Sequence, residues 1–336
     1  MTGDRSRWLI PALLVLTLVV ALIAVMTGAY PLTLSGMSRT VARWWAGLTP
    51  ESFEERVLLN IRGPRVIAGL AIGATLAAAG VVYQGLFRNP LVSPDVLGVS
   101  AGAGLGAVLG IFLSLPLVTI QITAFVVGLA TVGLVYLVAA TVRGRDPTLV
   151  LVLGGVVVGA LAGAAISLLK ILADPYDQLP AITFWLLGSL ASVRGNDIMS
   201  VLPVILVGLV PLVLLRWRIN ALSLGDDEAK TLGLDAGRLR FVVIAAATLM
   251  TASVVAIAGV IGWVGLVIPH IARMLVGPDF SRLLPASMLV GASYLVLVDT
   301  LARTIGRIEI PLGILTAVVG APFFLWLLWR GRHGWS

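Results

Sequence analysis

Long apolar runs follow one another along nearly the whole chain, and short stretches with charged residues, proline or glycine separate them. A helix that crosses a lipid bilayer needs roughly 20 consecutive apolar residues. Ten runs approach or exceed this length, so the pattern predicts an all-α membrane protein with about ten transmembrane helices. The predicted helices cover residues 8–28, 65–87, 95–113, 116–142, 148–173, 198–215, 239–259, 262–276, 283–304 and 311–329.

The composition supports this interpretation. Of the 336 residues, 59% are hydrophobic and 12% are charged, whereas soluble domains carry about 25% charged residues. A soluble globular protein is therefore excluded, and we expect residues 1–336 to form a single transmembrane domain. The run 8–28 is too long for a secretory signal and lacks a small-x-small cleavage site, so it is predicted as the first spanning helix.

Basic residues gather at the ends of the predicted helices, and the formal net charge of the chain is +7. Ten crossings place both termini on the same side of the membrane. If that side is the cytoplasm, more than half of the 23 lysine and arginine residues face it, in agreement with the positive-inside rule. Contacts with lipid explain the positive charge, so nucleic acid is not expected as a partner.

Several kinds of chemistry are missing from the sequence. The chain has no cysteine and two histidines, His270 and His333, which argues against thiol chemistry and a multi-histidine metal site. Its two lysines, Lys170 and Lys230, do not follow a glycine-rich phosphate-binding turn, so the chain is not expected to bind ATP by that route. No HExxH helix occurs, and we do not expect an enzyme.

Asp299 and Lys170 are the carboxylate and the lysine that lie in the interior of the apolar runs. Asp299 precedes Arg303 by four residues, on the same helical face, which predicts a local ion pair. The alternative is an ion-coupled secondary transporter in which Asp299 is the coupling acid. Lys170 lies near a helix end and can snorkel. Because the apolar runs contain so little charge, we expect a pathway for a large substrate that is already complexed. A partner protein would then supply the energy for its movement.

The polar stretch 216–240 is longer than a connector between helices needs to be. Ser223 is expected to cap a short helix with Asp226 and Glu228 in its first turns, and Gly233 is expected to end that helix. The length of the stretch predicts a docking surface on the cytoplasmic side.

Four segments carry a further pattern: IRGPR at 61–65, QGLFRNPLVSPDVLGVSAGAGLGA at 84–107, LSLGDDEAKTLGL at 222–234 and GWVGLVIPHIARMLVGPD at 262–279. In order and spacing they resemble the permease subunits of binding-protein-dependent ABC importers for iron chelates, haem and cobalamin, which have the type II import fold. The resemblance covers essentially the whole chain. Gly63 departs from the Arg-Leu-Pro-Arg sequence that the family usually has.

The resemblance implies a set of partners. A second permease copy would form a homodimer with the pathway at its interface, two ATP-binding cassette subunits would bind ATP and magnesium, and one extracytoplasmic substrate-binding protein would deliver the substrate. The chain itself would need no cofactor. It would lie in the cytoplasmic membrane of a bacterium or archaeon with both termini in the cytoplasm.

The resemblance also assigns residues. The expected ATPase-coupling residues are Leu222, Gly225, Asp226, Glu228 and Gly233. The expected docking residues for the binding protein are Arg62, Arg65 and Arg303, which would alternatively anchor helix ends at lipid headgroups. The expected gate residues are Asn89, Leu91, Thr148 and Leu149, although a plain structural turn at 89–91 remains an alternative. Pro269 and His270 mark the fold and are given no chemistry.

The substrate is ranked from the resemblance alone. A ferric siderophore comes first, haem or cobalamin second, and an oxyanion such as molybdate last. The residues themselves do not select among these substrates.

Overall fold

The computed structural model of the chain describes residues 5–28, 30–142 and 147–330. These ranges contain helices and no strand, which confirms the predicted all-α class. Helices overlap all ten predicted spanning ranges: α1 (Arg5–Met26), α4 (Gly63–Leu86), α5 (Val99–Phe112), α6 (Leu117–Thr141), α7 (Pro147–Leu172), α9 (Gly195–Leu214), α12 (Ala236–Ala258), α13 (Val264–Val276), α14 (Phe280–Ala302) and α15 (Leu312–Arg330).

Shorter elements connect these helices. They are α2 (Leu34–Trp45), α3 (Phe53–Arg56), the π-helix η1 (Val57–Arg62), the 3₁₀-helix η2 (Pro94–Leu97), α8 (Gln178–Leu187), α10 (Arg216–Leu224) and α11 (Asp226–Thr231). Of these, the sequence pattern predicted α11. The expected start of the second spanning helix at residue 65 is too late, because α3, η1 and α4 form one continuous helical segment from Phe53.

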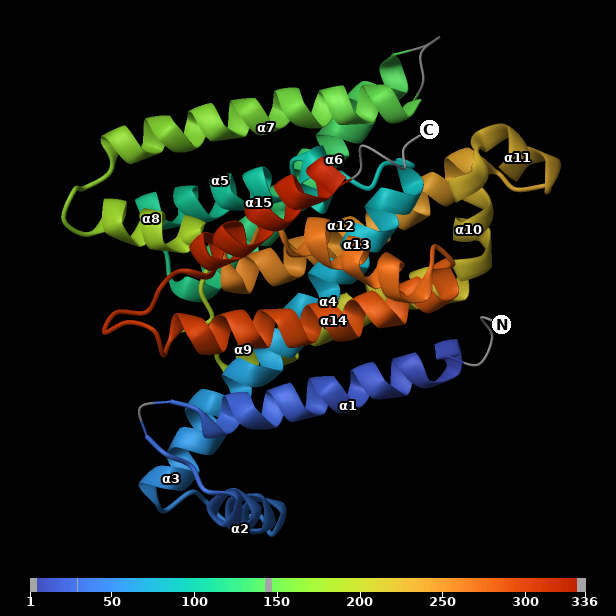
Figure 1. Ribbon diagram of the computed structural model, residues 1–336. Helices are drawn as coiled ribbons and strands as arrows, with labels where there is room; N and C mark the ends of the chain where they lie inside the picture. The colour runs from blue at the N-terminus through green and yellow to red at the C-terminus, as the bar shows by residue number, and fades with distance from the viewer. Residues whose placement is uncertain (1–4, 29, 143–146, 331–336) are drawn as a thin grey trace.

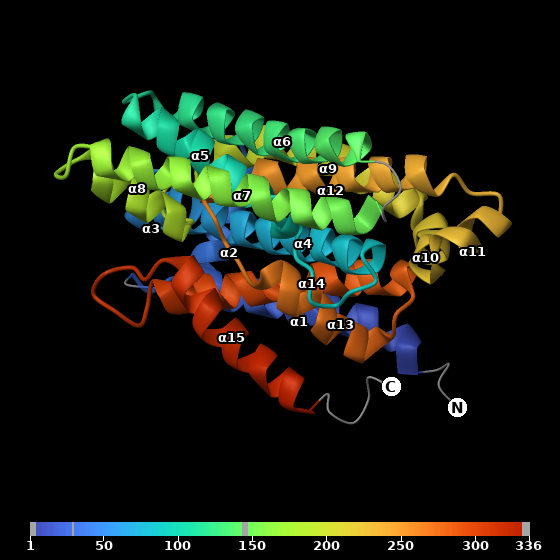
Figure 2. The ribbon, with the colours of Figure 1, turned by 90° about the horizontal axis from the view of Figure 1, so that it is seen from above.

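Seven helical segments of the described chain are long and apolar enough to span a membrane, and four shorter apolar helices accompany them. Most of these helices run across the picture in Figure 1. α10 and α11 lie at one end of the bundle, which we call the α11 end, and α2 and α3 lie at the other, which we call the α2 end. α1 begins at the α11 end, and α15 runs toward that end (Figures 1 and 2).

α4 passes through the middle of the bundle (Figure 2), and 78% of its most apolar window is buried. Glycines let α13 and α14 touch its backbone. A Cβ at Gly73 would overlap the carbonyl of Gly291 in α14, and a Cβ at Gly80 would overlap the carbonyl of Gly265 in α13. α4 is thus the helix around which its neighbours pack.

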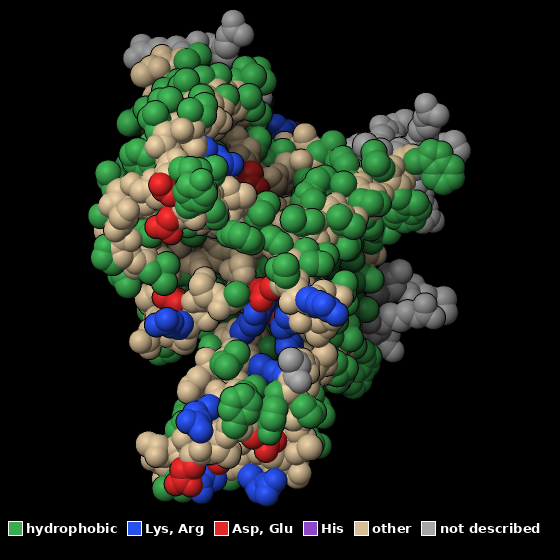
Figure 3. Space-filling model, turned by 90° about the vertical axis from the view of Figure 1, so that its left-hand side faces the viewer, with side chains coloured by type: hydrophobic (Ala, Val, Ile, Leu, Met, Phe, Trp, Pro, Cys, Tyr) green, Lys and Arg blue, Asp and Glu red, His purple; other side chains and the backbone are tan. Residues whose placement is uncertain are grey.

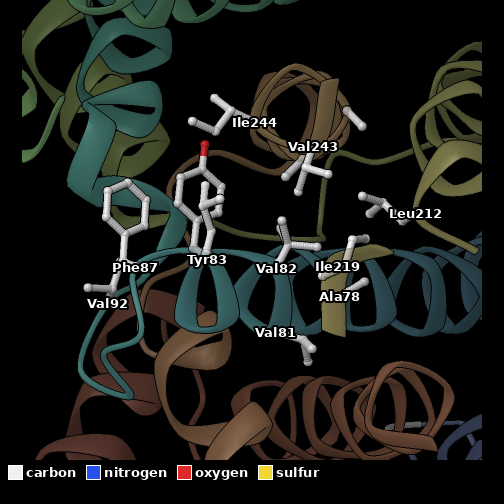
Figure 4. Packing of buried hydrophobic residues seen from close by; sticks show 14 of the residues in the cluster. Ala78, Val81, Val82, Tyr83, Phe87, Val92, Leu212, Ile219, Val243 and Ile244 are labelled. Carbon is white, nitrogen blue, oxygen red and sulfur yellow. The ribbon is translucent and has the colours of Figure 1, made fainter. Parts of the chain in front are cut away.

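The other side of α4 packs through large side chains. Figure 4 shows Val82 and Tyr83 pointing from α4 toward Val243 and Ile244 of α12. Tyr83 is fully buried, and its hydroxyl lies 3.0 Å from Thr248 Oγ1. This hydrogen bond satisfies a polar group that would otherwise be costly in the apolar core.

The outer helices are covered much less by the rest of the chain. The buried share of the apolar window is 17% in α1 and 22% in α7. α7 exposes a row of large apolar side chains: Leu149, Leu153, Val156, Val157, Leu161, Leu168, Ile171 and Leu172. In a membrane protein such faces meet lipid or another subunit.

The glycine contact of α4 gives a stability prediction. We expect Gly73→Leu to lower the free energy of unfolding by about 3 kcal/mol, because the new side chain must displace the α14 backbone. Gly133→Leu in α6 is the matched control, since a Cβ at Gly133 meets no atom within 4 Å. Thermal unfolding in detergent, followed by size-exclusion chromatography, measures both. Equal stability of the two variants would contradict the packing described for α4.

Candidate functional site

The polar stretch 216–240 folds into two short helices at the α11 end, and two glycines set their limits. α10 and α11 meet at Gly225, whose φ of 146° favours glycine. Gly233 has a φ of 74° and donates its N–H to the carbonyl three residues earlier, which ends α11 as expected. The expected cap at Ser223 is wrong, because its Oγ donates to the carbonyl of Asn220 within α10 at 2.7 Å.

α11 presents acidic side chains to its surroundings. Glu228 is exposed, and Asp227 exposes 94% of its side chain. Ala229 on the other side of the helix is fully buried and seats α11 on the bundle. The backbone of Asp226 begins α11, whereas its side chain lies outside the described residues.

Two other expected coupling residues, Leu222 and Gly225, pack against neighbouring parts of the chain. Leu222 is 2% exposed and belongs to the core between α4 and α12. A Cβ at Gly225 would overlap the carboxylate of Glu228 and would lie 3.5 Å from the guanidinium of Arg88. α11 therefore sits beside the loop that follows α4. The coupling role of these residues stays a prediction.

The expected gate residues come from two segments. Asn89 and Leu91 lie in the loop after α4, where Asn89 Oδ1 accepts a hydrogen bond from the Leu91 N–H at 2.9 Å. Thr148 and Leu149 lie in the first turn of α7. Leu91 is 41% exposed and Leu149 is 47% exposed. Both segments lie at the α11 end (Figure 1), and their gate role stays a prediction.

The segment that leads from this loop into α5 packs against α7. The carbonyl of Val96 lies so close to Gly155 of α7 that a Cβ at Gly155 would overlap it. Ser100 nearby is the central residue of GVSAG at 98–102, which has the GxSxG form of hydrolase elbows. Here it lies in the first turn of a helix that follows a 3₁₀ turn, and its Oγ donates to the carboxylate of Asp95. The setting is not that of a strand-to-helix elbow with a histidine base.

Asn220 joins α10 to the start of α14. Its Nδ2 donates to Asp279 Oδ1 at 2.7 Å, and its Oδ1 accepts from the Phe280 N–H at 2.8 Å. The hydrogen bond from Asn220 lowers the pKa of the Asp279 carboxyl below its usual value. A cavity of about 210 Å³, whose lining includes Asn89, Pro90 and Asn220, lies between this junction and the loop after α4.

A second polar link joins α4 to α13. Arg273 Nη2 donates to Gln84 Oε1 at 2.9 Å, and Gln84 Nε2 donates to the carbonyl of Leu266 at 3.0 Å. His270, three residues before Arg273, lies edge-on to the ring of Phe323 in α15. Gln84 was not among the predicted site residues, although a polar side chain inside an apolar run is itself a signal.

At the α2 end, two of the expected docking arginines hold the end of α1. Arg62 Nη1 donates to the carbonyl of Val25 at 3.0 Å, and Arg303 donates to the carbonyls of Ala24 and Thr27. The last carbonyls of a helix have no partner within the helix and carry partial negative charge. The two guanidinium groups therefore cap α1.

The third arginine lies between two carboxylates. Arg65 Nη2 donates to Asp299 Oδ1 at 2.7 Å and to Glu309 Oε1 at 2.6 Å. The predicted ion pair between Asp299 and Arg303 is present, with Arg303 Nε 3.7 Å from Asp299 Oδ2, but Arg65 is the closer partner. We call Arg62, Arg65, Arg303, Asp299 and Glu309 the arginine cluster. Figure 3 shows the face of the α2 end, with acidic and basic side chains in its middle and lower parts.

The arginine cluster is turned inward. Arg62 is 6% exposed, and the side chains of Arg65 and Arg303 are each 12% exposed. The three guanidinium groups are engaged within the chain, and their docking role stays a prediction. Asp299 is 2% exposed and is already paired, which disfavours its use as the coupling acid of a secondary transporter.

The arrangement of helices and polar links can be compared with known proteins. A family model described as the FecCD transport family matches residues 15–330. The chain belongs to this family. The resemblance of the sequence motifs to importer permeases is thereby confirmed, and the FecCD match spans nearly all of the described helices.

Two relatives of this FecCD chain are similar over nearly their whole length. The molybdate import system permease protein MolB of Haemophilus influenzae is 39% identical over 334 residues, which is 99% of each chain. The hemin transport system permease protein HmuU of Yersinia pestis is 35% identical and covers 98% of this chain and 97% of its own. A solved structure described as an inward-facing conformation of an ABC transporter assigned to the metal-chelate type aligns with a TM-score of 0.86. It is 38% identical and covers 96% of this chain and 98% of its own.

The arginine cluster predicts a large effect from one substitution. Arg65→Gln leaves the buried Asp299 without its closest cation, and loss of one partner of a buried pair costs about 3 to 5 kcal/mol of unfolding free energy. Asp299→Asn in the same chain should restore part of this loss. Arg307→Gln, at an exposed position, is the control that should stay within about 0.5 kcal/mol of the original chain. Thermal unfolding in detergent compares the variants, and unchanged stability of Arg65→Gln would refute the role of the cluster.

Proposed function

We propose that this FecCD chain is the membrane permease of an ATP-driven importer for a bulky metal chelate, with a ferric siderophore as the first candidate and haem or cobalamin as the next. The observation that carries the proposal is the α10–α11 unit. It stands at one end of a bundle whose outer helices are apolar, and Asn220 ties it to α14. The similarity to permeases along the full length supports the same function.

α11 is the surface that we assign to the ATPase subunits. Asp226 begins it, Glu228 is exposed on it, and Gly225 and Gly233 set its limits. Two cassette subunits, which would themselves bind ATP and magnesium, would dock on α11. ATP hydrolysis would take place in those subunits, and this chain would only change its conformation. Leu222, buried beneath, would join α10 firmly to the core, so that α10 passes a displacement of α11 on to the bundle.

Movement of α11 has two routes into the bundle. Through α10, the hydrogen bonds of Asn220 lead to the first turn of α14. The second route starts at Gly225, which lies next to the Arg88 side chain, and leads to the loop that holds Asn89 and Leu91. The cavity beside Asn220 leaves this loop room to shift. We infer that both routes open a gate formed by this loop and the first turn of α7, with Thr148 and Leu149.

We infer that two copies of the chain meet along α7, with the pathway between them. α7 exposes a row of leucine and valine side chains, and Lys170 near its end is its one charged residue. A neutral wall offers a chelate no group that could hold it tightly. Passage then depends on opening of the gate, which suits transport driven by a separate ATPase.

A second candidate substrate is an oxyanion such as molybdate. The similarity to MolB over 99% of both chains favours it. The similarity to HmuU and to the metal-chelate type transporter supports the chelate. The neutral face of α7 does not discriminate between a chelate and an oxyanion, so the binding protein must determine which substrate is imported.

The binding protein would meet the α2 end. Arg62, Arg65 and Arg303 are engaged within the chain, so we assign them the role of positioning this face. The direct contacts with acidic groups of the binding protein are assigned to the exposed Arg194 and Arg307.

The coupling proposal is tested by reversing charge on α11. We expect Asp226→Lys with Glu228→Lys to reduce the ATPase that copurifies with the permease by at least about tenfold, because mismatched charges at an interface cost several kcal/mol. Asp177→Lys, exposed at the start of α8, is the matched control. Unchanged copurification in the α11 variant would refute the assignment.

The substrate proposal is tested on the assembled transporter. With its ATPase and binding protein in liposomes, and with a protonophore present, we expect ATP-dependent uptake of a ferric siderophore and retention of iron by the binding protein. Elemental analysis of the purified binding protein distinguishes the candidates: molybdenum without iron would favour the oxyanion. Uptake that needs a proton gradient and no ATP would refute the importer and support a secondary transporter.

A further inference from the structure

α2 is a helix that the pattern of spanning segments did not predict, and it lies across the bundle. In Figure 1 it is seen nearly along its axis, whereas the neighbouring α1 runs across the picture. It lies beside the last turns of α1, at the level where the spanning helices end (Figures 1 and 2). Thr33 begins the helix, because its Oγ1 accepts a hydrogen bond from the Gly36 N–H at 3.1 Å.

The side chains of α2 are divided between two sides. Leu34, Val41 and Trp45 are spaced by seven and four residues, so they lie on one side of the helix, and they are 61%, 51% and 84% exposed. Arg39 and Arg43 lie on the opposite side. A helix with such exposed apolar side chains needs a cover in the native setting, because water is a poor environment for them.

The side of α2 that carries the arginines is fastened to the rest of the chain. A Cβ at Gly36 would overlap the carboxylate of Glu54 in α3. Arg43 pairs with Glu51 at 2.9 Å and with Glu55 at 3.0 Å. These contacts fix the rotation of α2 about its axis, so its apolar side cannot turn toward the protein.

The arginine side of α2 is turned toward α3 and the residues before it, which lie at the outer edge of the α2 end. Figure 3 looks onto this end, and acidic and basic side chains gather in its lower part, where α2 and α3 lie. The apolar side of α2 is opposite to Arg39 and Arg43 and is therefore turned toward the level of the membrane. The exposed apolar side chains of α1, such as Leu18 and Ile23, line that level.

We propose that α2 is an interfacial helix that inserts Leu34, Val41 and Trp45 into the bilayer leaflet at the α2 end. α2 lies at the level where the spanning helices end, it has an apolar and a charged side, and its rotation about its axis is fixed. These are the properties of a helix that lies in the membrane surface. Trp44 and Trp45 at its end suit the boundary between acyl chains and headgroups. Both α1 and α2 expose large apolar side chains at this end, so that one leaflet would cover both.

The insertion also reaches the central helix. Glu55, which pairs with Arg43, accepts hydrogen bonds from the backbone N–H groups of Glu51 and Ser52. It thereby caps the helical segment that runs through η1 into α4. The position of α2 in the leaflet therefore sets the position of the start of α4. The inference depends on the membrane setting of the chain and not on the proposed import function.

The chain has no cysteine, so single-cysteine variants can be labelled at one site each. Val41→Cys and Arg39→Cys, two residues apart on opposite sides of α2, are labelled with a nitroxide in the full-length protein and reconstituted into phosphatidylcholine vesicles. Electron paramagnetic resonance measures how accessible each label is to oxygen, which partitions into the bilayer, and to a water-soluble nickel chelate. We expect the Val41 label to be several-fold more shielded from the nickel chelate than the Arg39 label and to be more accessible to oxygen.

Three results would overturn the proposal. Equal access of nickel to both labels would mean that the apolar side stays in water. Shielding of the Val41 label that appears only after the binding protein is added would make α2 a protein docking surface. Spin–spin broadening between Val41 labels would place a second copy of the chain on this face.

Discussion

Backbone contact between α4 and its neighbours α13 and α14 is the constraint on which the remaining structure depends. Within a bilayer the lipid tails are as apolar as the side chains, so apolar burial provides little force to hold helices together. Close packing and polar links must do so instead. The glycine pairs of α4 allow the backbones to touch, and Gln84 with Arg273 adds a hydrogen-bonded tie between α4 and α13. Because α13 and α14 both pack on α4, events at the α11 end and the α2 end share one central helix.

Arginine serves as an internal tie at several points of the molecule. Arg62 and Arg303 hold the end of α1, and Arg65 joins α4, α14 and the segment before α15 through Asp299 and Glu309. A planar guanidinium with five donors can contact two carboxylates or several carbonyls at once, which an ammonium group cannot match in geometry. At these points charged side chains are therefore used for structure, whereas those of α11 are exposed.

The spanning helices were predictable from the sequence because each is an apolar run. The hydropathy of a run is a local property that does not depend on tertiary contacts. α2, α8 and α10 were not, since each is short, and α2 mixes apolar with basic residues within twelve positions. The capping of α11 was misassigned because Ser223 and Gly225 both suit a helix start, and the choice depends on how α10 ends. Asp299 and Arg303 are neighbours on one helix, so their pair was visible. Arg65 is 234 residues from Asp299, and no local pattern announces that contact. The inward turn of the arginine cluster followed from the same long-range contacts.

The cap on α1 has a consequence for how the protein is made. Thr27 and its partner Arg303 are separated by 276 positions, and α1 is covered by the rest of the chain over only 17% of its apolar window. During synthesis α1 enters the membrane first, yet one of its two arginine caps is added only when α14 has been inserted. Until then the end of α1 depends on lipid contact and on Arg62. Completion of the nascent chain is thus coupled to the docking of its first helix, and a truncated chain that ends before α14 would leave α1 without that fastening.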